Sequence, residues 1–328
     1  MISFALRRTG AAIVLLVVLT ALVFVLQHVA PGDPARAYLG GNASPSAVAA
    51  TRHRLGLDDP LLEQYLRYLG HAARGNLGVS VRTHRPVITD LRQFLPATAE
   101  LVLVAFILAV ALAALFAFTG ALKVPGGAVL RGLLLIGASA PAFLLALAGI
   151  EIFYARLGWL PAAGRGVDHS TPTGLVLVDS VLHLDPASFL TGLRHLLLPA
   201  LALAIAPAIS IGRMLRASLE ATYDADHVRT ARSKGLHEAP VLARHVVRNS
   251  LGPALSMGGL QLGFMFAGVV VIEQVFSWPG IGLYLADSIP DSDFPAIAGV
   301  TLLLGSVYIV VNAVVDVLQA VADPRLTV

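Results

Sequence analysis

The residues of this chain that could do chemistry do not form a recognisable catalytic set. No G-x-x-x-x-G-K-[ST] phosphate loop occurs in the 328 residues, so we expect the chain itself neither to bind nor to hydrolyse ATP. The segment HEAPVLARH lacks the two-histidine spacing of H-E-x-x-H, and no G-x-S-x-G elbow is present. The absence of cysteine excludes thiolate catalysis and cysteine-bound metals. We therefore expect no catalytic residue, no metal site and no cofactor on this chain.

One group of polar side chains lies in the last apolar segment, where the cost of burying charge makes a functional role the default hypothesis. Asn312, Asp316 and Gln319 have i, i+4, i+7 spacing, so on a helix they share one face. We expect this face to point into a bundle of helices. Two interpretations stay open: Asn312 and Asp316 line a translocation path, or they form ordinary hydrogen bonds with neighbouring helices.

A second polar group precedes the motif FSWPGIG. Glu273 and Gln274 lie before Trp278, a residue type that suits a membrane interface, and the following Pro-Gly pair predicts a turn. These three residues either belong to a translocation path or gate, or anchor the chain at the interface.

The composition that surrounds these groups is that of an integral membrane protein. Hydrophobic residues make up 56%, charged residues 13%, and the mean hydropathy is +0.78. Six apolar runs are long enough to cross a bilayer as helices, at residues 10–29, 95–122, 130–157, 195–215, 251–275 and 295–321. The first run could be a signal peptide, but its length and the QHVAPGDPA turn that follows favour a retained span. We expect kinks at Pro141, Pro199 and Pro207.

The charges predict how these spans are oriented. With Arg7 and Arg8 in the cytoplasm, six crossings place both chain ends on that side, and the basic excess of residues 213–248 agrees. The loop after the first span holds eight arginines, but long segments translocate largely regardless of charge. Loop charges of this kind also explain the isoelectric point near 9.4, so we expect no nucleic-acid partner.

Four regions follow from this reading. They are an N-terminal transmembrane helix (1–30), an extracytoplasmic segment with short helices (31–94), a transmembrane domain (95–321) and a cytoplasmic tail (322–328).

The extracytoplasmic segment predicts two short helices. The first has Ser44 as N-cap, Pro45 in its first turn and Gly56 past its end; the second has Asp59 as N-cap and Gly75 past its end. The apolar stripe of the second helix consists of Leu62, Leu66 and Leu69. We expect this stripe to pack against the ends of the spans rather than to bind a ligand.

A charged segment, ATYDADHVRTARSKGLHEAP (221–240), lies between two apolar runs. Asp224 and Asp226 suit the start of a short helix, whereas Arg232 and Lys234 suit its last turn before Gly235. A second helix through PVLARHVVRNS is expected to lie at the bilayer interface. The segment is either a solvated loop or a docking element made of two capped helices.

Within this segment, DHVRTARSKGL resembles the cytoplasmic loop of ATP-binding-cassette importer permeases, specifically the dipeptide, oligopeptide and nickel branch. In importers at large the loop reads E-A-A, three residues, then G. Aligned on Gly235, this chain has Arg229, Thr230 and Ala231 in those places, a form that the peptide branch commonly shows. GNLGVSVRTHRPV, LPATAEL, RLGWLPAAG, EQVFSWPGIG and the closing DPR are each similar to segments that the branch carries in this order. The resemblance therefore covers essentially the whole chain.

The resemblance implies an all-α polytopic permease with the type I importer fold, in the bacterial plasma membrane. It implies a homologous second permease, two cytoplasmic ATPase domains that hold ATP and Mg, and an extracytoplasmic peptide-binding protein as partners, besides membrane lipid. Residues 216–250 would form the loop that couples to the ATPases, and the charged segment at its centre would be the coupling helix. The expected coupling residues are Asp224, Asp226, Arg229, Thr230, Ala231, Arg232, Ser233, Lys234 and Gly235.

Rival functions explain less of the sequence. A secondary carrier requires paired polar sites and related halves, but no convincing internal repeat is found and the charged segment would have no role. An intramembrane enzyme lacks a catalytic set. Nickel or glutathione stays open as an alternative cargo to peptides.

Overall fold

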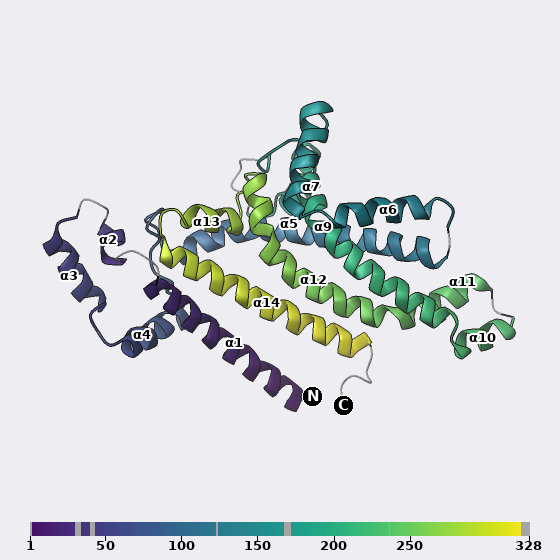
Figure 1. The fold of residues 1–328 in the computed structure, drawn as a ribbon, viewed down its shortest axis with the longest axis horizontal. Coiled ribbons are helices and arrows are strands. Elements are labelled where there is room, and N and C mark those ends of the chain that lie inside the picture. Colours follow the sequence, from purple (N-terminus) through teal and green to yellow (C-terminus); the bar gives the residue numbers. More distant parts are fainter. Residues whose placement is uncertain are drawn as a thin grey trace. The chain divides into compact units, whose positions relative to one another are not determined.

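The computed structural model describes residues 2–29, 34–39, 43–122, 124–166, 172–235 and 237–322 (Figure 1). In these ranges the chain is helical, and extended pairing is limited to one isolated bridge between Val79 and Pro86. The chain divides into two compact units. Unit 1 comprises Met1–Pro96 and Pro279–Ile309, and unit 2 comprises Ala97–Trp278 and Val310–Val328.

Two long helices, α5 (Val87–Ala121) and α14 (Phe294–Ala322), contribute residues to both units. The other helices of unit 1 are α1 (Ile2–Val29), α2 (Pro34–Leu39), α3 (Pro45–Leu55), α4 (Leu61–Ala73) and α13 (Ile281–Ser288). Those of unit 2 are α6 (Gly127–Ala138), α7 (Ala142–Gly149), the π-helix η1 (Ile150–Arg156), α8 (Val176–Leu182), α9 (Pro186–Tyr223), α10 (Asp226–Ser233), α11 (Glu238–Val241), the π-helix η2 (Leu242–Val247) and α12 (Arg248–Val275).

The membrane spans agree with the sequence prediction except at the third. In the described part of the chain, five helical stretches are long and apolar enough to cross a bilayer, namely Thr9–Val29, Val87–Ala121, Pro186–Tyr223, Glu238–Val275 and Phe294–Val317. The third predicted span is instead a bent pair, Gly127–Ala138 and Ala142–Arg156, with 111° between its halves. Six spans result if this pair is one span.

The three prolines that predict kinks behave differently. At Pro141 the helix breaks completely, because proline has no N–H to donate and disfavours helical geometry in the residue before it. Helix α9 runs unbroken through Pro199 and Pro207. Both of these prolines are buried, and a span packed among neighbouring helices tolerates the lost hydrogen bonds.

Helix α3 confirms its predicted caps, whereas α4 begins one residue late. Ser44 Oγ accepts a hydrogen bond from Ala47 N at 3.3 Å, and Gly56 takes a left-handed φ of +65° after α3. Helix α4 has Pro60 in the cap position without a side-chain bond, so the prediction of Asp59 as N-cap is wrong. Pro60 is held in an extended conformation, which moves the helix start on by one residue, and Asp59 forms an ion pair with Arg67 instead.

The predicted packing of the leucine stripe on α4 is wrong for two of its three members within unit 1, whereas Leu69 is half-buried. Leu62 and Leu66 are 68% and 57% exposed. Helix α4 packs on α1 through its opposite face, where Tyr65 Oη donates to Val17 O at 3.1 Å and Gln64 Oε1 lies 3.2 Å from His28 Nε2. Polar groups near a membrane need partners and leucine needs none, so the helix buries its polar side.

Unit 1 is built around the start of α5 and the start of α14. Its apolar core consists of Val87, Leu91, Ile281, Tyr284, Ala296 and Val300. Beside this core the carboxylate of Asp90 accepts hydrogen bonds from Thr83 Oγ1 at 2.5 Å and Tyr284 Oη at 3.2 Å. Burial raises the pKa of the Tyr284 phenol to about 12, so the phenol stays a hydrogen-bond donor at physiological pH.

Helix α9 is the centre of unit 2 and packs against α6, α7, α8 and α12. Small residues let α5 approach it closely, since Ala109 meets Ala204 and Ala208 in one buried cluster. A Cβ added at Gly212 would lie 3.1 Å from the carbonyl oxygen of Ala113. The spans around α9 therefore form one tightly packed body to which the charged segment is attached.

Candidate functional site

The charged segment forms the short helix that the sequence predicts. Helix α10 runs from Asp226 to Ser233, and Asp224 is the residue that ends α9. Lys234 caps α10, and Gly235 follows with a left-handed φ of +79°, as expected of the corner residue.

The second predicted helix is not a separate interfacial helix, which corrects that expectation. Its residues form α11 and η2, and they continue without a break into α12 as the stretch Glu238–Val275. Pro240 lies in the first turn, where a missing N–H costs no helical hydrogen bond. The end of the charged segment is therefore the beginning of a membrane span.

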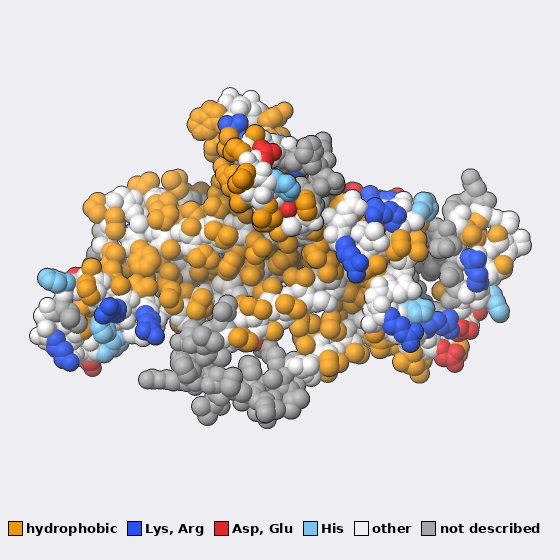
Figure 2. All heavy atoms as spheres, turned by 180° about the vertical axis from the view of Figure 1, so that it is seen from behind, with side chains coloured by type: hydrophobic (Ala, Val, Ile, Leu, Met, Phe, Trp, Pro, Cys, Tyr) orange, Lys and Arg blue, Asp and Glu red, His pale blue; other side chains and the backbone are white. Residues whose placement is uncertain are grey.

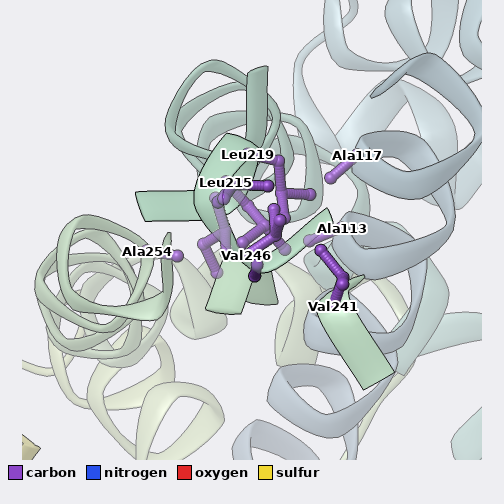
Figure 3. Packing of buried hydrophobic residues seen from close by; sticks show 10 residues of the cluster. Ala113, Ala117, Leu215, Leu219, Val241, Val246 and Ala254 are labelled. Carbon is purple, nitrogen blue, oxygen red and sulfur yellow. The ribbon is translucent and has the colours of Figure 1, made fainter. Parts of the chain in front are cut away.

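One face of α10 is anchored in the packed body of unit 2 (Figure 3). Val228 is fully buried and Ala231 is 6% exposed. They join a cluster with Ala113 and Ala117 of α5, Ile211, Leu215 and Leu219 of α9, and Val241, Val246 and Ala254 of the α11–α12 stretch. The small side chain of Ala231 thus lets the helix lie close to three spans.

The opposite face of α10 is charged and exposed. The side chain of Asp226 is 98% exposed and that of Arg229 is 68% exposed, with 3.8 Å between their charged groups. Thr230, Ser233 and Lys234 are exposed as well. Figure 2 shows Lys, Arg and His side chains gathered at this end of unit 2, next to a surface of hydrophobic side chains over the spans.

A three-residue clamp closes the corner at Gly235. Arg232 Nη2 donates to Glu238 Oε1 at 2.8 Å, and Arg232 Nε donates to Oε2 of the same carboxylate at 3.2 Å. The guanidinium also lies 4.2 Å from the ring centroid of Tyr223, whose hydroxyl donates to Glu238 Oε1 at 3.0 Å. The hydrogen bond to Glu238 raises the pKa of Arg232. The clamp joins the end of α9, the end of α10 and the start of α11.

Sequence reasoning missed Tyr223 and Glu238 as members of this clamp. Arg232 and Glu238 are six residues apart across a left-handed turn, so no helical spacing connects them. The sequence indicates this clamp only by the presence of a tyrosine, an arginine and a glutamate on either side of Gly235.

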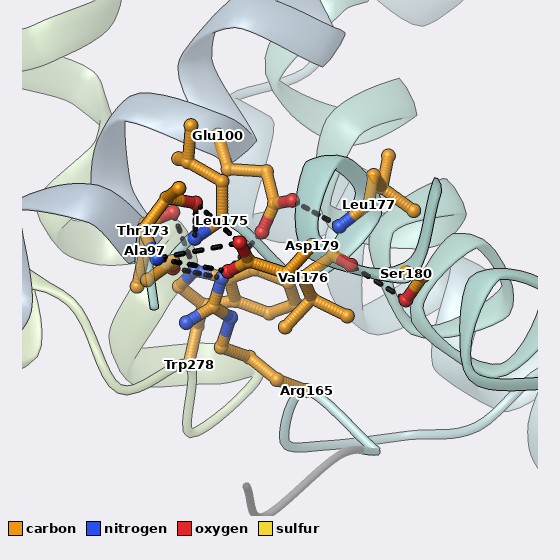
Figure 4. A network of polar contacts seen from close by, with 11 residues as sticks. Ala97, Glu100, Arg165, Thr173, Leu175, Val176, Leu177, Asp179, Ser180 and Trp278 are labelled. Carbon is orange, nitrogen blue, oxygen red and sulfur yellow. Dashed lines mark hydrogen bonds and ion pairs between the residues drawn. The ribbon is translucent and has the colours of Figure 1, made fainter. Parts of the chain in front are cut away.

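At the other end of α9 lies a buried polar network that includes Trp278 (Figure 4). Trp278 is 1% exposed, and its indole Nε1 donates to Ala97 O at 3.0 Å. The guanidinium of Arg165 lies 5.4 Å from the Trp278 ring centroid, forms an ion pair with Glu100 and donates to Gly174 O at 3.0 Å. Trp278 is therefore part of a packed network in unit 2.

The same network fixes the start of α8. Glu100 Oε1 accepts a hydrogen bond from Leu177 N at 2.7 Å, and Thr173 Oγ1 donates to Asp179 Oδ1 at 2.9 Å. Glu100 thus serves both Arg165 and the first turn of a helix, where negative charge is favourable.

The polar pair next to Trp278 divides between two environments. Glu273 is fully buried and accepts a hydrogen bond from Thr98 Oγ1 at 2.6 Å, whereas Gln274 is exposed. On α14, Asn312 and Asp316 are half-buried, and the side chain of Gln319 lies outside the described residues. A role for any of these residues in a translocation path stays a prediction.

Comparison with known proteins covers nearly the whole chain. Residues 109–328 match the family described as binding-protein-dependent transport system inner membrane component, and residues 1–102 match the N-terminal family of the same transport systems. A di/tripeptide transport system permease protein of Pseudomonas aeruginosa is 41% identical over 99% of both chains. A dipeptide transport system permease protein of Alkalihalophilus pseudofirmus is 35% identical over 99% of both chains. A probable D,D-dipeptide transport system permease protein of Escherichia coli is 38% identical over 98% of this chain and 96% of its own.

Proposed function

Because the chain belongs to the family of binding-protein-dependent transport system inner membrane components, we propose that it is the permease subunit of an ATP-driven importer of di- and oligopeptides. The chain is a multi-pass protein of the plasma membrane. The names of relatives that align with nearly all of its length support a peptide cargo.

In this function the chain forms half of a translocation pore, and a homologous second permease forms the other half. An extracytoplasmic binding protein delivers the peptide. Two partner ATPase domains bind ATP and Mg and supply the energy, so this chain contributes the path and the mechanical connection to the motor.

The observation that carries the proposal is the two-sided construction of α10. Its charged face, which carries the ion pair of Asp226 and Arg229, is exposed and accessible to a partner surface. Its other face is fixed through Val228 to α5, α9 and the stretch that leads into α12. A displacement imposed on α10 is therefore passed to three spans as a rigid-body movement, whereas a flexible loop would absorb it.

Alternating access follows from this connection. When the ATPases close, they move α10, and the spans attached to it change which side of the membrane the path opens to. The clamp of Tyr223, Arg232 and Glu238 keeps α10 at a fixed angle to α9 during the movement.

The first experiment co-purifies the chain with the products of its neighbouring genes and measures ATP hydrolysis stimulated by the binding protein. Arg229→Glu, on the exposed face of α10, should retain the membrane fold and abolish most of the stimulation. Arg244→Glu is the matched control, because it inverts an exposed charge on η2 outside α10 and should retain stimulation. Purification of the chain alone, with transport that needs no ATP, would support a secondary carrier instead.

Cargo is tested separately by uptake. Cells that contain or lack the chain are given a labelled dipeptide, a labelled tetrapeptide, nickel or glutathione. Uptake of a peptide that depends on the chain supports the proposal, whereas dependence only for nickel or glutathione contradicts the peptide assignment and retains the importer.

A further inference from the structure

A groove on the surface of unit 2 has an apolar floor and a basic rim. It has a volume of about 460 Å³ and is lined by Phe116 of α5, Leu135 of α6, and Arg213, Arg216, Ala217 and Glu220 of α9. Pockets that bind small molecules have volumes in this range. The groove lies within a single unit, so its geometry depends only on the packing of α5, α6 and α9.

Close helix contacts define the walls of the groove. A Cβ added at Gly137 of α6 would lie 3.2 Å from Ile205 Cγ2, and one added at Gly212 of α9 would lie 3.1 Å from Phe116 Cδ1. One turn further along α9, the side chain of Arg216 lies against α5, since a Cβ added at Gly120 would lie 2.8 Å from the Cδ of Arg216. These contacts fix the positions of α5, α6 and α9 relative to one another and so fix the shape of the groove.

The charges in the groove leave one cation uncompensated. Arg216 Nε donates to Glu220 Oε1 at 2.8 Å, so these two charges neutralise each other. Arg213 is exposed, and in the parts of the chain that the structure describes no acidic group pairs with it. Counting Arg213, Arg216 and Glu220, the groove carries one net positive charge.

The groove also lies near the end of α9, one of the helices long and apolar enough to cross a bilayer. On one side it borders the buried apolar cluster of Phe116, Leu134 and Ile209. In the other direction α9 ends at Tyr223, ten residues and about 15 Å after Arg213, where the charged segment begins. An apolar surface therefore lies next to a cation, and this arrangement matches the acyl chain and the phosphate of a phospholipid.

We infer that this groove binds an anionic phospholipid from the leaflet on the side of α10. The phosphate lies between Arg213 and Arg216, and one acyl chain follows Phe116 and Leu135. Arginine suits a phosphodiester because its fork of N–H donors matches the phosphate oxygens. A lipid with one net negative charge balances the single positive charge of the groove, whereas a zwitterionic lipid adds an ammonium group beside Arg213.

A second cavity on the other side of Arg213 does not share these properties. It has a volume of about 550 Å³ and is lined by Met214, Met257, Leu260 and Gln261 among others, but Arg213 is the only basic residue in its lining. Both cavities carry one net positive charge, but the first groove also offers the N–H donors of Arg216 to a phosphate, which makes it the better phosphate site.

The inference is tested on the purified full-length chain by native mass spectrometry with added dioleoyl phosphatidylglycerol or dioleoyl phosphatidylcholine. We expect phosphatidylglycerol to bind more tightly. Arg213→Gln should weaken it about fivefold, as expected for one basic residue near a lipid surface, and should leave phosphatidylcholine unchanged. Arg213→Lys should retain most of the affinity. Arg244→Gln is the matched control and should have no effect.

Two further variants separate charge from packing. Glu220→Gln removes the negative charge and frees Arg216, so phosphatidylglycerol should bind more tightly than to the unaltered chain. Leu135→Asn places an amide on the apolar floor and should weaken both lipids. Glu220→Gln should raise the affinity for phosphatidylglycerol and Leu135→Asn should lower it. Misfolding would not explain opposite changes at two residues of the same groove.

Three results would overturn the inference. Equal affinity for both lipids would show that the groove does not select net charge. Displacement of phosphatidylglycerol by millimolar inorganic phosphate would show a free-anion site. If Arg213→Gln retained lipid affinity and lost association with a second permease, the groove would be a protein interface.

Discussion

Arg165 and Glu100 show how single residues hold the packed body of unit 2 together. Their side chains are only 14% and 5% exposed, so each charge depends on the other for stabilisation. Arg165→Leu should therefore destabilise the protein by about 3 to 5 kcal/mol, because the carboxylate of Glu100 stays buried without its counter-charge. Thermal unfolding of the protein in lipid nanodiscs measures this loss.

The matched control is Glu151→Ala, which removes an exposed ion pair. The side chain of Glu151 is 57% exposed and that of its partner Arg156 is 72% exposed. An exposed pair contributes at most about 1 kcal/mol, so this variant should unfold close to the temperature of the unaltered protein. Equal shifts for the two variants would show that the network around Trp278 does not depend on a buried charge.

The clamp makes a second prediction at this scale. Arg232→Gln removes both the ion pair with Glu238 and the contact with the Tyr223 ring, so amide hydrogen exchange in residues 226–235 should become faster. The exchanged pair Arg232→Glu with Glu238→Arg should slow it again. Arg229→Gln on the same helix is the control, and its exchange rates should stay unchanged, because the Arg229 side chain is 68% exposed and takes no part in the clamp.

The packing of α12 against α14 depends on a glycine within unit 2. A Cβ added at Gly259 would lie 2.4 Å from both methyl groups of Val315, whereas one added at Gly252 on the same helix meets no atom within 4 Å. Gly259→Ala should therefore destabilise the protein by about 1 to 3 kcal/mol through overpacking. Gly252→Ala should be neutral or stabilising by up to about 1 kcal/mol, since alanine favours helix.

Val315→Ala provides the rescue for this prediction. In the Gly259→Ala background it removes the two methyl groups at 2.4 Å but keeps the Cβ of residue 315, which lies 2.8 Å from the new methyl group. The relief is therefore partial, and the double variant should unfold at a temperature between those of Gly259→Ala and the unaltered protein. Additive losses in the double variant would contradict a direct contact between these two positions.

Elements that are determined by neighbouring residues were predictable. Ser44 and Gly56 fix the two ends of α3 by hydrogen bonding and a left-handed φ, both of which act within a few residues. The same logic predicts α10, whose end at Gly235 follows from local charge and turn chemistry. Such signals do not depend on what the helix packs against.

Features that depend on distant partners were not predictable. The face that α4 buries is decided by hydrogen bonds that join Gln64 and Tyr65 to α1, tens of residues away, so Leu62 and Leu66 gave a false packing signal. The network of Glu100, Arg165 and Trp278 likewise joins three separate segments. Pro141 looks like Pro199 in sequence, yet only the latter lies in a densely packed span.

For the whole chain, the number of crossings decides which side of the membrane α10 occupies. Among the described residues, five helices are each long and apolar enough to cross the membrane, and one further pair of helices is bent by 111°. If the bent pair crosses the membrane, the crossings number six, and α10 lies on the same side as the N-terminus. If the pair re-enters on the side from which it came, every later segment changes side.

The absence of cysteine makes this question testable with single-cysteine variants. We choose three exposed positions, Glu63 before α5, Ala163 after the bent pair and Asp226 on α10, and label each variant in intact cells with a membrane-impermeant maleimide. If the pair crosses, Glu63→Cys and Ala163→Cys react in intact cells, and Asp226→Cys reacts only after permeabilisation. If the pair is re-entrant, Asp226→Cys reacts together with Glu63→Cys, and Ala163→Cys is protected. A coupling role for α10 requires the first pattern, because only that pattern places Asp226 and Arg229 where an ATPase can reach them.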